Sequence, residues 1–234
     1  MAFESIRLIT FDCYGTLIDW ENGMLNVMRP MFSRDGRSIR DAELLKSYGE
    51  IEAEIESGNY LPYRQVLMQA VLEMGRRFNV PVSAEQGTDF AESIMRWEPF
   101  ADTVPALQLL AGRFQLGIIS NVDDDLFAKT RKKLSPVEFA FVVTAQQMRS
   151  YKPSFRNFEE AIQRSGLKKD QILHAAQSLY HDIAPANALG IRNVWVNRPS
   201  AYPGAGAAKR GTAQPEFEVR TLAELVTLLN SASA

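Results

Sequence analysis

Four polar stretches carry the residues that could do chemistry, and each lies at or shortly after the end of an apolar run. They are Asp12, Ser120-Asn121, Lys152 and Asp182. A carboxylate becomes a usable nucleophile when it is shielded from water and aimed at an electrophilic carbon. A lysine close to it supplies the positive charge that keeps such a carboxylate ionised. The pattern therefore indicates nucleophilic catalysis by Asp12, with Lys152 as its charged partner.

The other residues near these stretches suit supporting roles. Gly15 permits a tight turn after Asp12, and the Thr16 hydroxyl can hold a carboxylate oxygen. Ser120 and Asn121 offer hydrogen bonds to a substrate carboxylate. We expect Asp182 either to anchor Lys152 or to guide the water that hydrolyses a covalent intermediate.

Each residue also has an ordinary structural interpretation. An aspartate at a strand end commonly forms a turn or a helix cap, and a serine, asparagine or lysine there can belong to a plain loop. Cys13 should point away from Asp12, because neighbouring strand residues alternate between faces. Of the two histidines, His174 lies within an apolar run and is expected to be structural, whereas His181 is a weaker candidate for substrate contact. Only the combination of motifs favours a catalytic site.

Apolar runs that alternate with helical patterns must position these residues. Strands are predicted at 6–11, 115–120, 139–144, 172–175, 193–196 and 216–219, and helices at 103–111, 124–134, 155–164, 185–189 and 222–229. Continuous apolar strands between helices are typical of a parallel sheet that is covered on both faces. Ligands bind such sheets at the carboxyl ends of the strands, which is where the polar stretches fall.

The segment between the first two strands has a different pattern. Leu44, Tyr48, Ile51 and Ile55 recur at helical spacing, and a second helical pattern covers 63–78. We predict a doubly wound, Rossmann-like α/β core formed by residues 1–17 and 96–234. An all-helical cap is predicted for residues 18–95. The Gly-, Ala- and Pro-rich stretch 200–215 is expected to be a flexible surface loop.

Composition excludes several classes of protein. The formal net charge of the 234 residues is -2, with 26 basic and 28 acidic residues, so nothing indicates a nucleic-acid or membrane-surface binder. The single cysteine excludes an internal disulfide and suits a reducing compartment. The N-terminus does not resemble a signal peptide, and no apolar run approaches the length of a membrane span. We expect a cytoplasmic protein, a monomer or homodimer, that acts on a small molecule.

The motifs, taken together, resemble those of the haloacid dehalogenase superfamily over nearly the whole chain. The stretch 11–17, FDCYGTL, is similar to the first motif of the superfamily, in which the aspartate is the nucleophile. Residues 119–121, 151–153 and 180–183 resemble the second, third and fourth motifs. The resemblance implies the catalytic set Asp12, Thr16, Lys152 and Asp182.

The residue at position 14 distinguishes two branches of this superfamily. Its phosphatases carry a second aspartate two residues after the nucleophile, which protonates the leaving alcohol and helps to hold Mg²⁺. This sequence has Tyr14 there, and a tyrosine is a poor acid near neutral pH. The first motif with tyrosine at this position resembles instead that of the (S)-2-haloacid dehalogenases, which need no metal or other cofactor. In that branch the aspartate attacks C2 of a small carboxylic acid in an SN2 step, and water then frees a 2-hydroxy acid.

The leaving-group pocket departs from the pattern of that branch. No arginine aligns with the halide-binding arginine of an early cap helix, where this chain has residues 44–48. Phe158 replaces the usual tyrosine after the third motif, and the stretch 177–179 contains Ser178 in place of a Ser-x-Asn pattern. We nevertheless expect Tyr14, Phe158 and Ser178, together with Ser120 and Asn121, to bind substrate.

A missing cationic donor favours a leaving group that departs neutral, such as a protonated ring amine. One branch of the family hydrolyses L-azetidine-2-carboxylate to 2-hydroxy-4-aminobutyrate, and this sequence is compatible with that activity. Trp20 could offer an aromatic face to such a group, or could simply be a cap-core contact. Two other classes stay open: a Mg²⁺-dependent phosphatase that acts on a small phosphate ester, and a binding protein of this fold without catalysis.

Overall fold

A parallel sheet of six strands lies at the centre of the computed structural model, which describes residues 3–34, 37–199 and 206–231. The strand order is β5-β4-β1-β6-β7-β8, and every pair in it is parallel. The strands are β1 (Leu8–Phe11), β4 (Gln115–Ser120), β5 (Phe141–Thr144), β6 (Ile172–Ala176), β7 (Arg192–Val196) and β8 (Phe217–Val219). The central strand, β1, is buried at all four positions, as both faces of the sheet are covered.

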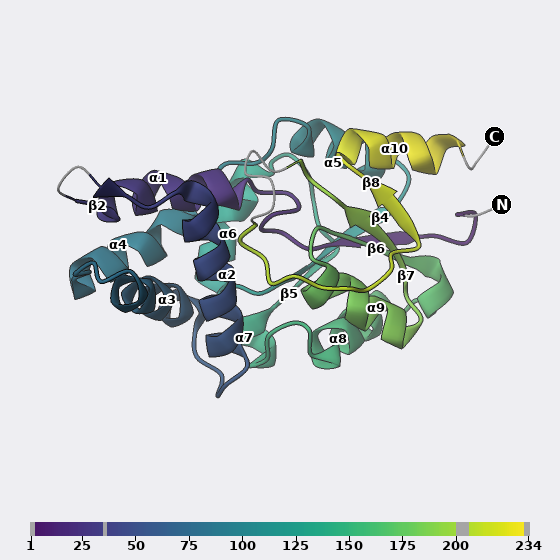
Figure 1. Ribbon diagram of the computed structural model, residues 1–234. Coiled ribbons are helices and arrows are strands. Elements are labelled where there is room, and N and C mark those ends of the chain that lie inside the picture. The colour runs from purple at the N-terminus through teal and green to yellow at the C-terminus, as the bar shows by residue number, and fades with distance from the viewer. Residues whose placement is uncertain (1–2, 35–36, 200–205, 232–234) are drawn as a thin grey trace.

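Helices pack on both faces of this sheet (Figure 1). Helices α5 (Thr103–Ala111) and α10 (Leu222–Ser231) contact each other on one face, and α8 (Phe155–Ser165) and α9 (Ala184–Leu189) contact each other on the other. The remaining elements of this part are α6 (Asp124–Lys133), α7 (Ala145–Met148), η2 (Lys169–Gln171) and the π-helical turn η3 (Leu179–Ile183). The predicted doubly wound α/β core is confirmed.

The insertion after β1 forms a separate helical layer beside the sheet, at the left of Figure 1. It contains α1 (Trp20–Met31), α2 (Asp41–Glu56), α3 (Tyr63–Arg77), α4 (Ala84–Ser93) and η1 (Ile94–Arg96). A short antiparallel pair, β2 (Ser33–Arg34) with β3 (Arg37–Ser38), is an addition to the expected all-helical cap. Two residues per strand are too few to be recognised from a period-two pattern. The boundaries 1–17, 18–95 and 96–234 stay a prediction.

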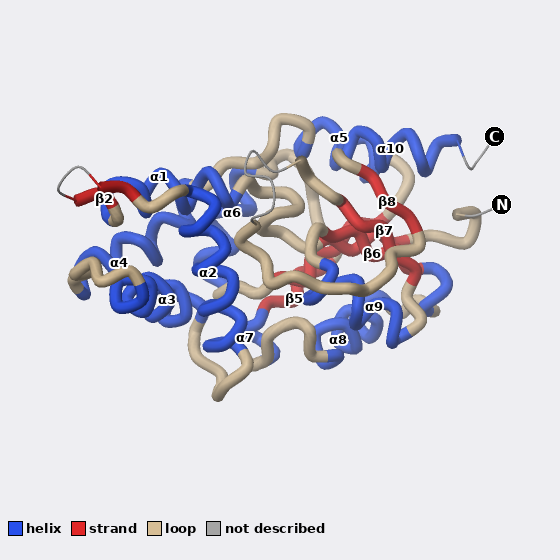
Figure 2. The backbone as a smooth tube through the Cα atoms, in the orientation of Figure 1, coloured by secondary structure: helices blue, strands red, loops and turns tan. Residues whose placement is uncertain are grey.

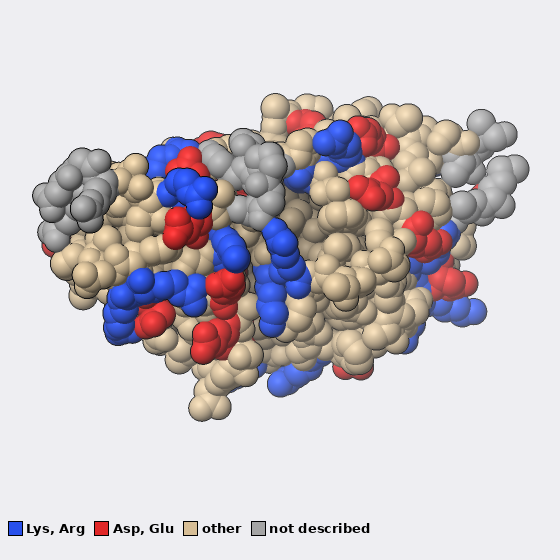
Figure 3. Space-filling view, viewed as in Figure 1, with Lys and Arg blue, Asp and Glu red and all other residues tan. Residues whose placement is uncertain are grey.

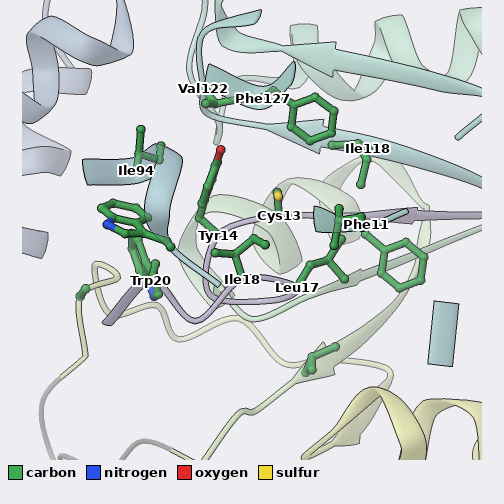
Figure 4. Packing of buried hydrophobic residues seen from close by; sticks show 14 of the residues in the cluster. Phe11, Cys13, Tyr14, Leu17, Ile18, Trp20, Ile94, Ile118, Val122 and Phe127 are labelled. Carbon is green, nitrogen blue, oxygen red and sulfur yellow. The ribbon is translucent and has the colours of Figure 1, made fainter. Parts of the chain in front are cut away.

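One large apolar cluster joins the sheet to the helical layer. It includes Phe11 and Ile118 from the sheet, together with Met28 and Leu67 from the insertion. Figure 4 shows the part of this packing that surrounds Cys13, whose thiol is buried among apolar side chains. Because the two parts share this cluster, we infer that the described cap residues are held firmly against the core.

The described part of the expected surface loop, residues 206–215, contains no helix or strand and is exposed or half-buried except at Ala207. Residues 200–205 lie outside the described residues. Ala207 is fully buried, and its amide donates to Glu21 Oε1 at 3.1 Å. Its carbonyl lies against Gly49, on α2. Ala207 alone departs from the predicted surface position, because a small residue can pack closely between helices.

Acidic and basic side chains are interspersed on the face that Figure 3 shows, so no large region of this face carries charge of one sign. None of the described helices is long and apolar enough to cross a bilayer.

Candidate active site

The carboxyl ends of the strands bring the predicted residues together. Strand β1 lies between β4 and β6, so Asp12, which follows β1, is flanked by residues that follow its two neighbours. Ser120 ends β4, and Asp182 lies in η3, shortly after β6. From Asp12 the chain leads directly into α1 of the helical layer, which therefore faces this end of the sheet (Figure 2).

Lys152 joins the two aspartates. Its Nζ donates to Asp12 Oδ1 at 2.7 Å, to Asp182 Oδ1 at 2.7 Å and to the carbonyl of Ile119 at 3.0 Å. The side chain is 2 % exposed. An ammonium group has three N–H donors, so these acceptors occupy all of them. Lys152 therefore holds the nucleophile in place and has no donor left for a substrate.

Thr16 fixes the second oxygen of the nucleophile. Its hydroxyl donates to Asp12 Oδ2 at 2.7 Å and accepts from the backbone amide of Gln177 at 2.9 Å. Arg198 in turn donates to the Thr16 carbonyl. Gly15 has φ 90°, a conformation that other residues rarely adopt. The loop after β1 thus presents the Asp12 carboxylate in one orientation.

Burial and charge act against each other at this triad. Burial raises the pKa of Asp12, and the Lys152 ammonium opposes that rise. Burial would also raise the pKa of Asp182, but Lys152 and the His174 hydrogen bond hold it below the usual range. The pKa of Lys152 would fall with burial, yet the two carboxylates raise it above its ordinary value. Lys152 is therefore a permanent cation in the folded protein.

A small cavity opens beside this triad. It is lined by Asp12, Tyr14, Trp20, Glu52, Glu56, Tyr63, Ser120, Asn121, Lys152, Gln177, Ser178, His181, Asp182 and Ala208. Catalytic groups from the core and side chains from the cap share the same space. This confined space suits a small substrate.

The residues expected to bind substrate lie at this cavity with one exception. Ser120 Oγ is fully buried and has no hydrogen-bond partner among the described residues. Asn121 instead holds the Lys152 backbone, since its Oδ1 accepts from the Lys152 amide at 2.8 Å. Ser178 bonds both the amide and Nδ1 of His181, at 2.9 and 3.1 Å. Ser120 is therefore the hydroxyl most available to a ligand.

Two aromatic residues line the same wall. Tyr14 Oη is hydrogen-bonded to Thr130 Oγ1 at 2.8 Å, and burial raises the pKa of the phenol well above its usual value. Trp20 begins α1 and packs edge-on against Tyr48, with ring centroids 6.3 Å apart. Figure 4 shows both rings at the junction of core and cap. They close the cavity against water and add no charge to it.

The expectation for Phe158 is wrong. This residue is fully buried in the smaller apolar cluster, and its ring lies 5.2 Å from that of His174. It does not line the cavity because α8 covers a face of the sheet rather than its carboxyl end. His174 is hydrogen-bonded to Thr10 at 2.9 Å and to Asp182 at 3.0 Å. Phe158 thus packs against the histidine that is hydrogen-bonded to Asp182.

Three cap residues at the cavity, Glu52, Glu56 and Tyr63, were not anticipated from the sequence. Tyr48 and Tyr63 both donate to Glu52 Oε1 at 2.7 Å. Glu56 accepts from Asn121 Nδ2 at 3.2 Å. The spacing offered one signal: Glu52 and Glu56 continue the stripe of Tyr48 at intervals of four residues. Acidic residues on a helix are usually solvated, so this stripe was not distinguishable from an exposed face.

The oxygen donors present do not suit Mg²⁺. Lys152 already occupies one oxygen of Asp12 and one of Asp182, and Tyr14 stands where a further carboxylate would be needed. Mg²⁺ prefers several oxygen ligands in octahedral order. Among the described residues, no group of three metal-ligating side chains is arranged to hold an ion.

Comparison with known proteins agrees with this geometry. The family model of haloacid dehalogenase-like hydrolases matches residues 6–190. An (S)-2-haloacid dehalogenase of Pseudomonas fluorescens is 27% identical over 97% of this chain and 99% of its own length. A glyceraldehyde 3-phosphate phosphatase of Methanothermobacter thermautotrophicus is 26% identical over 82% of this chain and 86% of its own length.

A solved structure extends the comparison to the fold. The L-2-haloacid dehalogenase of Xanthobacter autotrophicus, with chloropropionic acid covalently bound, superposes with a TM-score of 0.80. The alignment covers 96% of this chain and 98% of that one, at 18% identity. Taken with the family match over most of the sequence, these findings show that the chain belongs to the haloacid dehalogenase-like hydrolases.

Proposed function

We propose that this hydrolase acts by SN2 displacement at C2 of a small 2-substituted carboxylic acid, with Asp12 as the nucleophile. The observation that carries the proposal is the fixed carboxylate at a small cavity. Lys152 and Thr16 each donate to one oxygen of Asp12 at 2.7 Å. Tyr14 occupies the position at which a phosphatase would need an acid. Orientation of a nucleophile in this way lowers the entropic part of the barrier.

The reaction has two steps. An Asp12 oxygen attacks C2, the bond between C2 and the leaving group breaks, and an ester joins Asp12 to the substrate. Water then attacks the aspartyl carbonyl, which returns the Asp12 carboxylate and releases a 2-hydroxy acid. Asp182 lines the cavity, and its buried Oδ2 has no hydrogen-bond partner among the described residues. It is the acceptor we assign to orient that water.

The substrate is proposed to be an (S)-2-haloacid or L-azetidine-2-carboxylate, whose ring would open to 2-hydroxy-4-aminobutyrate. No arginine lines the cavity in the described residues to receive a departing halide. Ser120 Oγ, which has no partner, is placed to donate to the substrate carboxylate.

Proton NMR tests the proposal. The enzyme is incubated without added metal with (S)-2-chloropropionate and, separately, with L-azetidine-2-carboxylate. Lactate or 2-hydroxy-4-aminobutyrate is the expected product, and a single turnover in H₂¹⁸O should leave ¹⁸O in the Asp12 carboxylate. Asp12→Asn should abolish turnover without unfolding the protein. Retained activity in that variant, or Mg²⁺-dependent release of phosphate from a small ester, would overturn the proposal.

A further inference from the structure

The cap side of the cavity is acidic. Glu52 and Glu56 lie one helical turn apart on α2, and both line the cavity that contains Asp12. Glu52 is 3% exposed, and the side chain of Glu56 is 5% exposed. The titratable groups at the cavity other than tyrosine are Asp12, Glu52, Glu56, Lys152, His181 and Asp182. Four carboxyl groups thus share a small space with one ammonium.

Within the described residues, no cation is paired directly with either glutamate, and the charge of Lys152 only opposes the rise in the pKa of Glu56. Lys152 has all three N–H donors on other acceptors. Among the described residues, no lysine or arginine forms an ion pair with Glu52 or Glu56. The closest basic atom to Glu56 is Nε2 of His181, at 3.8 Å. Burial lowers the pKa of His181 to about 4, so this ring is neutral near pH 7.

Buried carboxylates without a cation are costly. Burial accordingly raises the pKa of Glu52 to about 7 and that of Glu56 well above its usual value. Both tyrosine hydroxyls bond Oε1 of Glu52, and no hydrogen bond from the described residues engages Oε2. The pair is therefore open to a positive charge that the protein itself does not supply.

A second observation on the core side also points to a ligand. Ser120 Oγ is fully buried at the end of β4, lines the cavity and has no partner among the described residues. Buried hydroxyls are rarely left without a hydrogen bond. The cavity thus offers a hydroxyl without a partner from the core and two carboxyl groups without a paired cation from the cap.

We propose that Glu52 and Glu56 are the specificity residues of this cavity and receive a cationic nitrogen of the substrate. The enzyme would then select small zwitterionic carboxylic acids, with the carboxylate toward Ser120 and the nitrogen toward α2, over simple anions. The inference rests on the proposed function for the position of C2 at Asp12. It goes further because it names the charge that the substrate must carry and the residues that recognise this charge.

Two ligands that differ at one ring atom test whether the cavity selects a cationic nitrogen. L-Azetidine-2-carboxylate and cyclobutanecarboxylate share ring size and carboxylate, but only the first carries a ring NH₂⁺. Their binding is measured by calorimetry on the Asp12→Asn protein, which binds without turnover. We expect L-azetidine-2-carboxylate to bind about tenfold more tightly or better, since a buried ion pair is strongly coupled. Equal binding, or tighter binding of cyclobutanecarboxylate, would mean that protonated glutamates bind anions, and would overturn the proposal.

Substitutions on α2 test which residues create the preference for the cationic ring. Glu52→Gln and Glu56→Gln keep the shape and the acceptor oxygen, and each should reduce the preference for the cationic ring by about tenfold. Glu54→Gln, on the exposed side of the same helix, is the matched control and should leave the preference unchanged. An undiminished preference in both cavity variants would contradict the assignment, with thermal unfolding used to establish that each variant is folded.

The two proposals fail separately. The absence of ¹⁸O from Asp12 after a single turnover would reject the proposed reaction, while the binding comparison on the inactive Asp12→Asn protein would still stand. Labelled Asp12 together with equal binding of the two rings would leave the reaction intact and reject the assignment of Glu52 and Glu56.

Discussion

At the scale of single residues, Lys152 is the centre of the site. It is one cation between two carboxylates, each at 2.7 Å, and almost no solvent reaches it. In such a triad the removal of the cation leaves two negative charges buried and unpaired. Lys152 therefore has two roles that can be measured apart: it stabilises the fold, and it keeps Asp12 ionised for attack.

Lys152→Met should affect both the stability of the fold and the ionisation of Asp12. We expect the free energy of unfolding to fall by about 3–5 kcal/mol, the usual cost of breaking a buried ion pair, as measured by urea denaturation. Without the ammonium the pKa of Asp12 should rise further, so that residual activity appears only at higher pH. A pH–rate profile that superposes on that of the wild type would contradict this role. Lys168→Met, at an exposed position, is the control.

Glu52 gives a prediction for the pH dependence of stability. Its pKa rises from 4.5 to about 7 on folding because of burial, in surroundings that include Tyr48, Tyr63 and Asp12. A folded state that holds its proton more tightly loses stability as pH rises through this interval. Wild type should lose about 3 kcal/mol relative to Glu52→Gln between about pH 4.5 and pH 7. Urea unfolding at several pH values measures this, and parallel curves would contradict it.

At the scale of elements, Asp123 links the core to the cap. It stands at the start of α6 but makes no hydrogen bond to cap that helix. Its carboxylate accepts instead from the backbone amides of Tyr63 and Arg64, at 2.8 and 3.0 Å, and so caps the first turn of α3. Because Tyr63 bonds Glu52, this cap places one wall of the cavity.

Asp123→Ala should destabilise the protein by about 1–2 kcal/mol, the usual cost of losing a helix cap. It should also raise KM more than it lowers kcat, since Tyr63 and Glu52 would be less well placed. Asp123→Asn keeps an acceptor and should recover part of both effects. Asp89→Ala, which removes an exposed aspartate from α4, should change stability little. Equal KM values in Asp123→Ala and wild type would rule out this link.

At the scale of the whole molecule, a loop of the core that is far from the cap in sequence packs against two cap helices. Ala207 packs between α1 and α2, and its neighbour Ala208 lines the cavity. A β-carbon at position 49 would lie 2.3 Å from the Ala207 carbonyl oxygen. The contact therefore requires glycine on α2, although glycine weakens a helix.

Gly49→Ala should lower stability by about 1–3 kcal/mol through overpacking, in spite of the better helix propensity of alanine. For a chain of this size that corresponds to a fall in Tm of about 2–4 °C for each kcal/mol. Activity should fall too, because Ala208 would move at the cavity. Gly58→Ala is the control, as its nearest neighbour would lie at 3.4 Å. A Tm at or above that of the control would refute the close contact.

The sequence by itself determined the layout of the core and its nucleophile. Buried parallel strands read as continuous apolar runs, and the helix at Thr103–Ala111 and the strand at Gln115–Ser120 agree with the predicted bounds. Asp12, Ser120, Lys152 and Asp182 were identified because parallel strands all end at one edge, so that position after a strand already implies proximity.

Only the tertiary structure decided which side chains of the helices meet that edge. A helical period shows that Tyr48, Glu52 and Glu56 share a face, but not that this face is turned toward Asp12. The prediction for Phe158 was wrong for the same reason, because the sequence does not say whether α8 covers a face of the sheet or its carboxyl end. Ala207 was assigned to the surface, although its small side chain fits between two helices. Strand ends converge by geometry, whereas helix faces and loops are placed by packing that involves the whole chain.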